Sequence, residues 1–340
     1  MVLEETNGAS RVTVVTVTYG ERRQFLEPML RAALAQGIEK VILVNNGAPW
    51  DVAALAAEID CERIKLVHLS KNMGSAAGFS AGISKALEQS AEMIWLLDDD
   101  NRATEGSLNV LLDAYTKLRE THLYDEFAVL AFRPEHQADV AMGASHRQVN
   151  SRRSSFLGFH IFDIPHKFWR RTPLGEHRPN QILPKIVRLD TAIYSGLFFH
   201  RKLVDRIGLP QTDFVLYGDD NEFTYRITRH GSGTYLITGA LLEDMESSWN
   251  VKRRHSNSFS GLLKGEGDFR AYYGMRNGVF FDTYCKGHNP IMYAINLRVY
   301  LTILFLFSRI YNRHERYCLL SQAVKDGLAK RLGLHSDYPL

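Results

Sequence analysis

The feature that most constrains the fold is an alternation of short, β-rich apolar runs with helical segments, which begins at residue 12. Short apolar runs separated by helical segments with apolar spacing near 3.6 residues are typical of βαβ units. We therefore expect an open, doubly wound α/β sheet, whose ligands bind at the carboxyl ends of the strands. The expected elements are strands at 12–19, 41–44, 64–69 and 93–97, and helices at 24–36, 75–89 and 107–118.

Periodicity weakens between about 133 and 190, where Pro, Arg and His accumulate. Such a stretch predicts a long, partly irregular insertion that lies over the active site. The 340 residues suffice for one large domain at 1–260, followed by a C-terminal helical region at 261–340 that contacts the acceptor or a membrane. The elements expected after the insertion are a strand at 193–199, helices at 201–207 and 219–230, a strand at 234–238, and helices beyond Gly265.

Cysteines, charge and the first residues indicate the cellular setting. The three widely spaced cysteines, Cys61, Cys285 and Cys318, indicate neither a disulfide framework nor a zinc site, which fits a reducing cytoplasm. The first ten residues carry two glutamates and no apolar segment, so no ordinary secretory signal is expected. A net charge of +3 is too small to indicate nucleic-acid binding. Basic residues crowd 152–188 and 252–254, which favours either a surface for phosphates or anionic lipid, or a solvated face.

The longest charge-free stretch of the C-terminal region is 299–308. Ten residues are too few to span a bilayer, whose core of about 30 Å needs about 20 residues. The stretch is therefore interpreted either as part of a core helix or as an interfacial helix whose arginines meet lipid headgroups. These arginines are Arg298, Arg309, Arg313 and Arg316.

The strongest local signal is a run of three aspartates, Asp98, Asp99 and Asp100, directly after the apolar strand at 93–97. Adjacent carboxylates repel one another, and their hard oxygen atoms suit Mg²⁺ or Mn²⁺. Either ion can also bridge diphosphate oxygens and stabilise a departing nucleotide. The alternative is an acidic turn that caps a following helix.

A second acidic cluster, Asp219, Asp220 and Glu222, opens the helix expected at 219–230. Capping explains one carboxylate at a helix N-terminus but does not explain three. If this turn faces the metal site, one carboxylate could accept a proton from an acceptor hydroxyl as the general base.

A third signal is the small-residue segment KNMGSAAGFSAG at 71–82, which leads into a helix. Its unobstructed backbone N–H groups could approach a diphosphate or a nucleoside. The segment matches neither the P-loop nor the GxGxxG fingerprint, so neither class of nucleotide-binding protein is indicated.

In their order along the chain, these segments resemble the GT-A fold of inverting family 2 glycosyltransferases. The resemblance covers about 12–282 and implies a GT-A-type doubly wound mixed sheet with a C-terminal helical extension. WLLDDD, the small-residue loop ending in GF, and YYGMRN at 272–277 are similar to bacterial galactofuranosyltransferases, which transfer galactofuranose from UDP-galactofuranose to lipid-linked glycans. Rhamnosyltransferases share most of the pattern and are the alternative. The matching segments are VTVVTVTYGERR, VILVNNGA, KNMGSAAGFSAG, WLLDDDN, SGLFFHRKLVDRIGLP and YGDDNEFTYRITRHG.

The resemblance implies a role for each matching residue. Asp98 and Asp100 would hold the metal and the donor, and Asp99 would lie against the donor. Asp220 would be the catalytic base of a single displacement that inverts the anomeric centre. The nucleotide would be lined by Thr18, Tyr19, Arg22, Asn46 and Asn72.

Two positions depart from the family pattern. Asn45 stands where relatives usually carry Asp, so the usual contact with the donor base is not implied here. Where relatives often place a metal-binding His, about two dozen residues after the base, this chain has LLEDMESSW. The third metal ligand is then Asp244, Glu243 or His255. His255 could instead reach the diphosphate beside a neighbouring arginine, or be a surface histidine in a basic loop.

Aromatic residues towards the C-terminus are candidates for the acceptor site. Trp249, Tyr272 and Tyr273 could stack against sugar rings, although core packing is the alternative interpretation. Arg276 and Asn277 lie one helical turn further and would face the same cleft. The predicted acceptor site also includes the first and last carboxylates of the second acidic cluster, Asp219 and Glu222.

Two other functions remain open. A nucleotidyltransferase would also use metal-bound carboxylates on an α/β sheet, but the N-terminal region has no obvious Gly-rich triphosphate loop. A non-catalytic glycan- or lipid-binding module is disfavoured by the intact acidic clusters. The expected partners are a nucleotide-sugar donor, with UDP favoured, and a glycan or glycolipid acceptor, for an enzyme in the cytoplasm or peripheral on the inner face of the cell membrane.

Overall fold

The computed structural model describes residues 11–122, 125–137, 140, 149–169, 183–246 and 258–340. Their contacts divide the chain into two compact units. Unit 1 comprises Met1–Gln137, Pro184–Thr212 and Asp220–Glu246, and unit 2 comprises Ala138–Leu183, Asp213–Asp219 and Ser247–Leu340. The chain passes repeatedly between the units, so the single boundary at residue 260 remains a sequence-based prediction.

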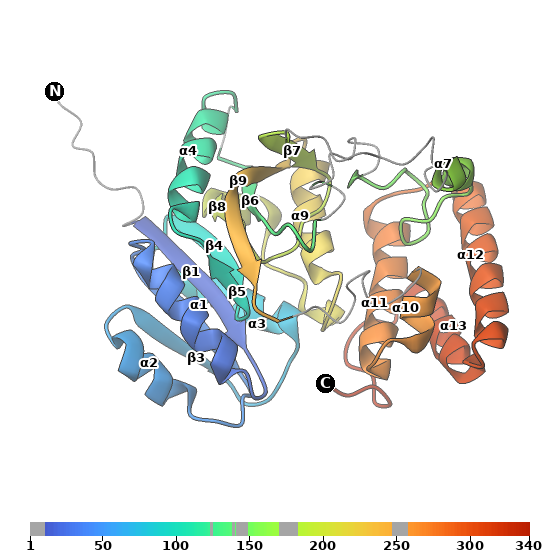
Figure 1. Ribbon diagram of the computed structural model, residues 1–340, viewed down its shortest axis with the longest axis horizontal. Coiled ribbons are helices and arrows are strands. Elements are labelled where there is room, and N and C mark those ends of the chain that lie inside the picture. The colour runs from blue at the N-terminus through green and yellow to red at the C-terminus, as the bar shows by residue number, and fades with distance from the viewer. Residues whose placement is uncertain (1–10, 123–124, 138–139, 141–148, 170–182, 247–257) are drawn as a thin grey trace. The chain divides into compact units, whose positions relative to one another are not determined.

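Unit 1 is built on a nine-stranded sheet of order β3-β2-β1-β4-β8-β6-β9-β5, with β7 paired to β9 (Figure 1). β3, β2, β1 and β4 are parallel, β8 is antiparallel to β4 and to β6, and β6 is parallel to β9. The sheet is therefore mixed, as expected. The strands are β1 (Val12–Thr18), β2 (Lys40–Asn46), β3 (Ile64–Leu69), β4 (Met93–Asp98), β5 (Asn101–Ala103), β6 (Ala128–Phe132), β7 (Ile186–Leu189), β8 (Leu197–His200) and β9 (Thr234–Asp244).

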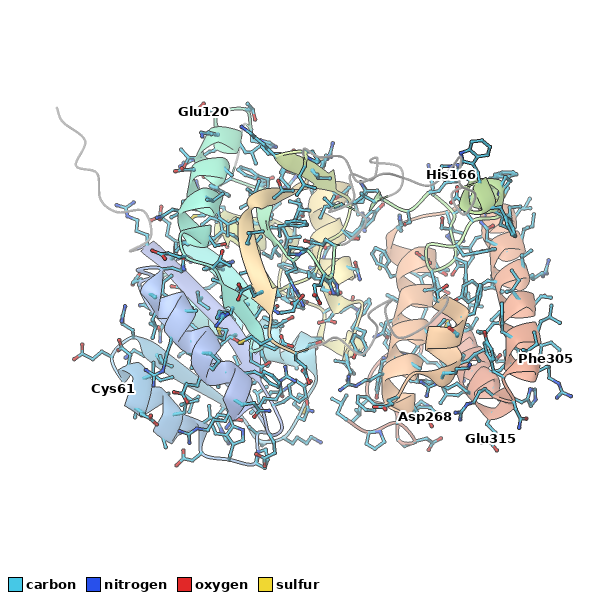
Figure 2. The ribbon with its side chains drawn as sticks, in the orientation of Figure 1. Cys61, Glu120, His166, Asp268, Phe305 and Glu315 are labelled. Carbon is cyan, nitrogen blue, oxygen red and sulfur yellow. The ribbon has the colours of Figure 1, made fainter. Side chains whose placement is uncertain are left out.

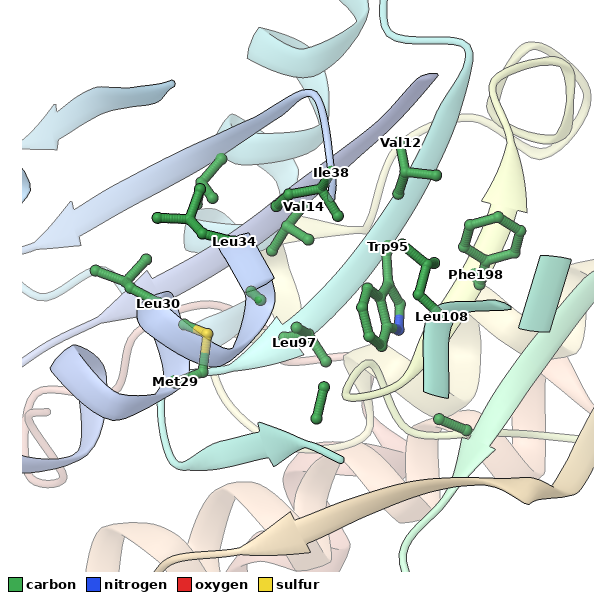
Figure 3. Packing of buried hydrophobic residues seen from close by; sticks show 14 of the residues in the cluster. Val12, Val14, Met29, Leu30, Leu34, Ile38, Trp95, Leu97, Leu108 and Phe198 are labelled. Atoms are coloured by element: carbon green, nitrogen blue, oxygen red, sulfur yellow. The ribbon is translucent and has the colours of Figure 1, made fainter. Parts of the chain in front are cut away.

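Successive side chains of a strand point to opposite faces of the sheet, and every residue of β1 is buried. Helices therefore cover both faces of this sheet. On one face, Val12 and Val14 of β1 join Trp95 and Phe198 in the main hydrophobic core (Figure 3). The other face packs against α3. The helices of unit 1 are α1 (Arg23–Ala35), α2 (Val52–Asp60), α3 (Ser75–Glu88), α4 (Ser107–Arg119), α8 (Lys202–Ile207) and α9 (Asp219–Arg229).

The small residues of α3 allow it to lie close against the sheet. A Cβ atom on Gly78 would lie 2.6 Å from Val17 Cγ1, and one on Gly82 would lie 2.4 Å from Val15 Cγ1. Both distances are far below van der Waals contact. Packing against β1 therefore accounts for these two glycines of the 71–82 segment, for which the sequence predicted an approach to a diphosphate or nucleoside.

The alternating elements predicted before residue 120 are present within one or two residues of the expected bounds. The sequence analysis missed α2, β5 and β6, and the strand expected at 234–238 continues to Asp244 as β9. The region 133–190 is not wholly irregular, since it contains α7 and β7. Parts of it lie outside the described residues, and its position over the active site stays a prediction.

Unit 2 is a helical assembly around its own aromatic core. Phe156, Tyr272, Tyr273 and Tyr300 are buried in this core together with residues of α13. Its helices are the short 3-10 turn η2 (Ile161–Asp163), α7 (Ile164–Trp169), α10 (Ser258–Lys264), α11 (Asp268–Phe280), the π-helical turn η5 (Phe281–Cys285), α12 (Pro290–Ile310) and α13 (His314–Leu328).

The apolar stretch at 299–308 lies within α12 (Pro290–Ile310), in the region that the sequence predicted to be helical. α12 has 21 residues and is, among the described residues, the one helix long and apolar enough to cross a membrane by length and composition. Only 28% of the most apolar 18-residue segment of α12 is buried in the protein. Arg298 interrupts the charge-free run without interrupting the helix, so counting the charge-free run alone did not identify α12 as long enough to cross a membrane.

Candidate active site

The candidate active site lies at one edge of the sheet of unit 1. β1, β2, β4, β6 and β9 run in the same direction, so their carboxyl ends meet at this edge. β4 ends at Asp98, and the short strand β5 follows the aspartates, so the alternative of a helix cap for Asp98–Asp100 is wrong. The polar residues at or just after the other four strand ends are Thr18, Asn46, Arg133 and Asp244.

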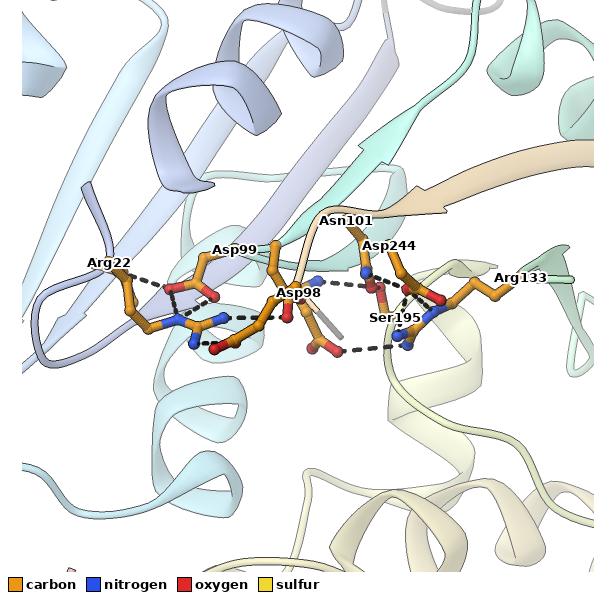
Figure 4. A network of polar contacts seen from close by, with 10 residues as sticks. Arg22, Asp98, Asp99, Asn101, Arg133, Ser195 and Asp244 are labelled. Atoms are coloured by element: carbon orange, nitrogen blue, oxygen red, sulfur yellow. Dashed lines mark hydrogen bonds and ion pairs between the residues drawn. The ribbon is translucent and has the colours of Figure 1, made fainter. Parts of the chain in front are cut away.

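Arg22 holds several carboxylates together at this edge (Figure 4). Its Nε donates to both oxygens of Asp99 at 2.9 and 3.0 Å, and its terminal nitrogens pair with Asp100, at 3.1 Å, and with Glu246. Thr18 Oγ1 donates a further hydrogen bond of 2.8 Å to Asp99, which is buried. The guanidinium also lies 5.1 Å from the centre of the Tyr19 ring, within range of a cation–π interaction. The side chains of Arg22 and Asp99 are therefore fixed relative to one another by these hydrogen bonds.

A second arginine, Arg133, neutralises the opposite side of the cluster. Its Nε donates to Asp244 at 2.7 Å, and its Nη1 lies 3.7 Å from Asp98 Oδ2. Asn101 Nδ2 also donates to Asp244, at 2.7 Å, and Asn101 Oδ1 accepts from Ser195 Oγ, which in turn accepts from the Asp98 backbone N–H at 3.1 Å. Asp98 therefore lies between the two arginines, as Figure 4 shows.

Electrostatics at Asp98 reflect this crowding. Burial, together with the neighbouring charges of Asp100, Asp99 and Asp220, raises the pKa of Asp98 to about 7 against the opposing effect of Arg133. Burial also raises the pKa of Asp99 to about 7, although Arg22 and the Thr18 hydroxyl favour its charged form. A cation added beside Asp98 would relieve this repulsion.

The raised pKa of Asp98 predicts how stability changes with pH when metal is removed. A carboxyl group with a higher pKa in the folded than in the unfolded state adds stability below its ordinary pKa of 3.8, and this stability is lost as the pH rises through about 7. The Asp98→Asn side chain does not ionise, so this variant does not lose stability in this way. In EDTA, the free energy of unfolding of Asp98→Asn relative to the natural chain should therefore increase between about pH 5 and pH 8, measured by urea unfolding.

Asp60→Asn is the matched control for this measurement. The backbone N–H of Arg63 lowers the pKa of Asp60 from its ordinary value, so Asp60 titrates below the tested range. Its replacement should leave the pH dependence between these two pH values unchanged. If Asp98→Asn and the natural chain gave parallel curves, Asp98 would not titrate in this range.

The predicted nucleotide residues Asn46 and Asn72 fix the loop that follows β3. Asn46 Nδ2 donates to Asn72 Oδ1 and to the Gly74 carbonyl, each at 3.1 Å, and its Oδ1 accepts from the Met73 N–H at 2.8 Å. Gly47 is required beside them, because its φ is +75° and a Cβ would lie 2.4 Å from the Asn72 nitrogen. Both side chains therefore shape this edge of the sheet, and nucleotide binding by them stays a prediction.

Asp220, the predicted base, lies at the start of α9 in unit 1, close enough for its charge to raise the pKa of Asp98. Its Oδ1 accepts from the backbone N–H of the next residue, Asn221, at 2.7 Å. Asp220 is half-buried. A carboxylate in the first turn of a helix is stabilised by the helix dipole, and this one can also accept a proton.

The flanking carboxylates of this cluster are more enclosed. Glu222 pairs with Arg226 at 3.0 Å one turn along α9, and Arg226 Nη2 donates to the Leu209 carbonyl at 2.9 Å. This contact network ties the helix to the loop after α8. Asp219 is 2% exposed. The contacts of Glu222 are structural here, and the acceptor role of both residues stays a prediction.

The predicted metal ligands fit a divalent cation only in part. Among the described residues, no group of three or more His, Cys, Asp or Glu side chains is arranged to hold a metal ion. Asp98 and Asp100 fit as two carboxylate ligands, and Mg²⁺ is commonly held by one or two carboxylates together with substrate phosphates. Asp244 fits poorly as the third ligand because Arg133 and Asn101 use its carboxylate, and Glu243 pairs with Arg102 on the surface.

The acceptor residues predicted on α11 are buried inside unit 2. Tyr272 donates to Asp326 at 2.8 Å, and Tyr273 donates to the Tyr338 carbonyl at 3.0 Å. Asn277 Nδ2 donates to the carbonyls of residues 214, 216 and 217 at 2.7–2.9 Å, and Arg276 donates to the carbonyl of residue 214 at 3.3 Å.

These bonds explain the RN pair of the YYGMRN segment. Val215 and Tyr217 have φ values of 67° and 64°, a left-handed backbone conformation that residues other than glycine rarely adopt. Asn277 satisfies the carbonyls of this turn, which directly precedes Asp219 and Asp220. In this structure Arg276 and Asn277 therefore hold a strained turn within unit 2, and the acceptor role of Tyr273 and Arg276 stays a prediction.

Two predicted residues, Trp249 and His255, lie outside the described residues. The site residues that sequence reasoning missed are Arg133, Asn101, Ser195 and Glu246. One signal for Arg133 was present, since it directly follows the apolar run AVLAF at 128–132, which forms β6.

Comparison with known proteins agrees with this geometry. The model of glycosyl transferase family 2 matches residues 13–169. The chain is 27% identical over 236 residues to galactofuranosyltransferase GlfT1 of Mycolicibacterium smegmatis, covering 68% of this chain and 70% of that protein. It is also 27% identical to galactofuranosyltransferase GlfT1 of Mycobacterium tuberculosis, but this match covers 47% of this chain and 45% of the relative.

Among solved structures, S. aureus TarS 1–349 in complex with UDP-GlcNAc has a TM-score of 0.51 and 11% sequence identity. The match covers 93% of this chain and 80% of that one. At this identity the likeness concerns the fold alone. The mixed sheet with flanking helices and a helical C-terminal region is the GT-A arrangement that the sequence predicted.

Proposed function

We propose that this chain, a glycosyltransferase whose residues 13–169 belong to glycosyl transferase family 2, transfers galactofuranose from UDP-galactofuranose to a glycan or glycolipid acceptor. The observation that carries the proposal is the cluster of Asp98, Asp99 and Asp100 at the carboxyl end of β4, with the Asp220 carboxylate close beside it. The choice of sugar is supported by the galactofuranosyltransferases among the relatives. The closely related alternative is transfer of rhamnose by the same machinery.

In the proposed donor site, the nucleotide lies along the edge formed by the ends of β1, β2 and β4. Thr18, Tyr19 and Arg22 follow β1, and Asn46 with Asn72 forms the adjacent loop. Asp99 is engaged by Arg22 and Thr18, so its contribution is to hold these two groups in place against the donor. Rigid placement of donor-binding groups lowers the entropic cost of reaching the reactive geometry.

In the proposed reaction, the oxygen of an acceptor hydroxyl forms a bond to the anomeric carbon as the bond between that carbon and the diphosphate oxygen breaks. UDP leaves with the bonding electron pair, and the anomeric centre inverts. The hydroxyl proton passes to the Asp220 carboxylate, which therefore acts as the general base. Asp220 is half-buried and accepts a hydrogen bond from the Asn221 N–H, so an acceptor can reach it while its orientation is maintained.

We propose Asp98 and Asp100 as the residues that hold Mn²⁺ or Mg²⁺ with the donor. A bound ion would neutralise charge that develops on the departing diphosphate. Around it, Arg133 and Arg22 balance part of the negative charge of the carboxylates, which would otherwise repel an anionic donor.

The experiment that tests this proposal is hydrolysis of a panel of donors by the purified chain. We would incubate the chain with UDP-galactofuranose, UDP-galactopyranose or dTDP-rhamnose in the presence of Mn²⁺, Mg²⁺ or EDTA. The release of the nucleoside diphosphate, UDP or dTDP, would be measured. We expect metal-dependent release of UDP from the furanose donor alone, because a site that hydrogen-bonds one sugar rejects a donor that leaves its buried polar groups unpaired.

Each other outcome has a defined meaning. Turnover of dTDP-rhamnose instead would replace the sugar but keep the roles of the aspartates. Release of pyrophosphate from nucleoside triphosphates would indicate a nucleotidyltransferase. Failure to bind any donor in calorimetry, combined with binding to glycans, would indicate a non-catalytic module. Equal turnover in EDTA would remove the metal from the proposal.

The lipid-linked acceptor that the resemblance implies would place the enzyme at the cytoplasmic face of a membrane. Within the part of the chain that the structure describes, α12 has the length and composition of a membrane-interacting segment. A cytoplasmic enzyme peripheral to the membrane is the location that we propose.

A further inference from the structure

The outer surface of α12 carries an apolar stripe in two parts, one near the start of the helix and one near its end. Because an α-helix has about 3.6 residues per turn, both parts fall on one face of the helix. Ile291 and Ile310 are 73% and 72% exposed, and Leu306 is 54% exposed. The stripe consists of Ile291, Ile295, Phe305, Leu306 and Ile310. Figure 2 labels Phe305 on α12, and its ring lies edge-on to Tyr317 of α13 with 5.3 Å between the ring centres, so it is only partly exposed.

The opposite face of α12 is fixed in the core of unit 2. Tyr293, Tyr300 and Leu304 are buried there, and Asn296 is fully buried. Asn296 Nδ2 donates to the Ser154 carbonyl at 2.8 Å, and its Oδ1 accepts from the Ile161 N–H at 3.0 Å. Removing the helix from the unit would expose this core and leave these groups without partners. α12 is therefore held in place as a surface helix with one exposed apolar side.

The charge of the stripe is wholly positive. Arg298 and Arg309 are exposed on the same side of the helix as the apolar residues, and the sequence of α12 contains no acidic residue. Two copies of this chain packed stripe to stripe in a symmetric dimer would bring these arginines together without an acidic partner from either α12. A surface of anionic phosphates complements both the charge and the apolar residues.

Exposed aromatic residues lie beside the same helix. Phe162, Phe168 and Trp169 of η2 and α7 are 60%, 64% and 54% exposed. The bond from Ile161 to Asn296 fixes their segment to α12, and Figure 1 shows α7 next to one end of that helix. Amphipathic helices that lie in the headgroup region of a bilayer combine Trp, Phe and Leu on one side with Arg or Lys. Aromatic rings of this kind anchor proteins at the boundary between headgroups and acyl chains.

We propose that the α12 stripe, with Arg298, Arg309 and the aromatic residues of η2 and α7, docks unit 2 onto the surface of an anionic lipid bilayer. The helix lies in the plane of the interface, with its apolar residues among the acyl chains nearest the headgroups and its two arginines on lipid phosphates. Because the inner face of α12 is committed to the core of unit 2, the helix does not cross the bilayer. This docking surface does not depend on which donor sugar the enzyme uses.

The test is flotation of the full chain with vesicles of phosphatidylcholine, alone or mixed with phosphatidylglycerol. We expect co-flotation with the anionic vesicles at low salt and a loss at high salt, because exposed charge interactions are screened. Arg298→Gln combined with Arg309→Gln should weaken binding about 25-fold, since each basic residue near an anionic surface contributes about a five-fold factor. Leu306→Ser combined with Ile310→Ser should weaken binding to a similar or greater extent.

Arg23→Gln combined with Arg31→Gln is the matched control, because it removes the same charge from exposed positions on α1 of unit 1. The control should float like the natural chain. All variants should release UDP from a soluble donor at the natural rate, which separates loss of docking from failure of the proposed function. Equal flotation of the control and the stripe variants would overturn the proposal.

Two further measurements distinguish other occupants of the stripe. Alkaline carbonate should release the chain from cell membranes, and resistance to extraction would mean that α12 spans the bilayer. Light scattering should give the same mass for the natural chain and the Leu306→Ser, Ile310→Ser variant. A dimer that dissociates in this variant, without any vesicle binding, would assign the stripe to a second copy of the chain.

Discussion

Replacing Asp220 with Asn is expected to lower the rate of sugar transfer by about 10²–10⁴-fold, the usual contribution of a general base. Asn has the same shape and can still accept the hydrogen bond from the Asn221 N–H, so the start of α9 should stay intact. It cannot accept the proton of the acceptor hydroxyl. UDP binding, measured by calorimetry with Mn²⁺, should be nearly unchanged. Removing a negative charge close to Asp98 also favours the ionised form of Asp98, so a loss of donor binding is not expected.

Asp219→Asn is the comparison that makes this prediction specific. Asp219 precedes Asp220 in the same helix start but is almost fully buried, so an acceptor hydroxyl would have poor access to it. Its replacement should cost less activity than Asp220→Asn, with thermal unfolding recorded for both variants. If Asp219→Asn abolished transfer while Asp220→Asn retained the natural rate, the base would be Asp219. If neither affected the rate, the base would not lie on this helix.

Replacing Arg22 with Met is expected to destabilise the fold by about 3–5 kcal/mol at pH 8, because it leaves the buried Asp99 carboxylate without its ion-pair partner. Both partners are well buried, with 12% of the Arg22 and 3% of the Asp99 side chain exposed. The loss should be smaller near pH 6, since burial raises the pKa of Asp99 and the carboxyl group can then become neutral. Urea unfolding at both pH values measures the effect.

Arg23→Met provides the matched control at the neighbouring position. Arg23 pairs with Glu58 at 3.2 Å, and both side chains are about half exposed. Exposed pairs of this kind contribute about 0–1 kcal/mol, so this variant should remain close to the natural chain. A double variant, Arg22→Met with Asp99→Asn, should recover part of the lost stability. Equal stability of the two single variants would show that the Arg22 pair does not support the fold.

Much of the candidate site at the ends of β1, β2 and β4 could be predicted from sequence because parallel α/β sheets bring separate strand ends to one edge. The apolar runs before Thr18, Asn46 and Asp98 located three such ends, and the βαβ rhythm set their common direction. Once these strands are parallel, residues far apart in the chain must lie close together. The position of Asp220 at the start of a helix was likewise visible from the residues around it.

The third metal ligand illustrates what the sequence could not decide. LLEDMESSW offered Glu243 and Asp244 as equivalent candidates, since both are hard oxygen donors. Because side chains alternate along β9, Glu243 pairs with Arg102 on the surface, whereas Asp244 meets Arg133 and Asn101. Arg133 follows β6, a strand that pairs with β9 although about 100 residues separate them. Long-range strand pairing of this kind has no local signal.

The sequence alone determined the fold class, the edge of the sheet that carries the polar residues, and the acidic clusters, whose order along the chain resembles that of family 2 glycosyltransferases. These features follow from local periodicity and from short runs of residues, both of which can be read from the sequence without knowledge of tertiary contacts. Tertiary structure decided which polar residues are neutralised by Arg22 and Arg133, that Arg276 and Asn277 hold a buried turn, and that α12 leaves one apolar face exposed. These depend on which surfaces meet when segments distant in the chain pack together, and burial, ion pairing and exposure are properties of that packing.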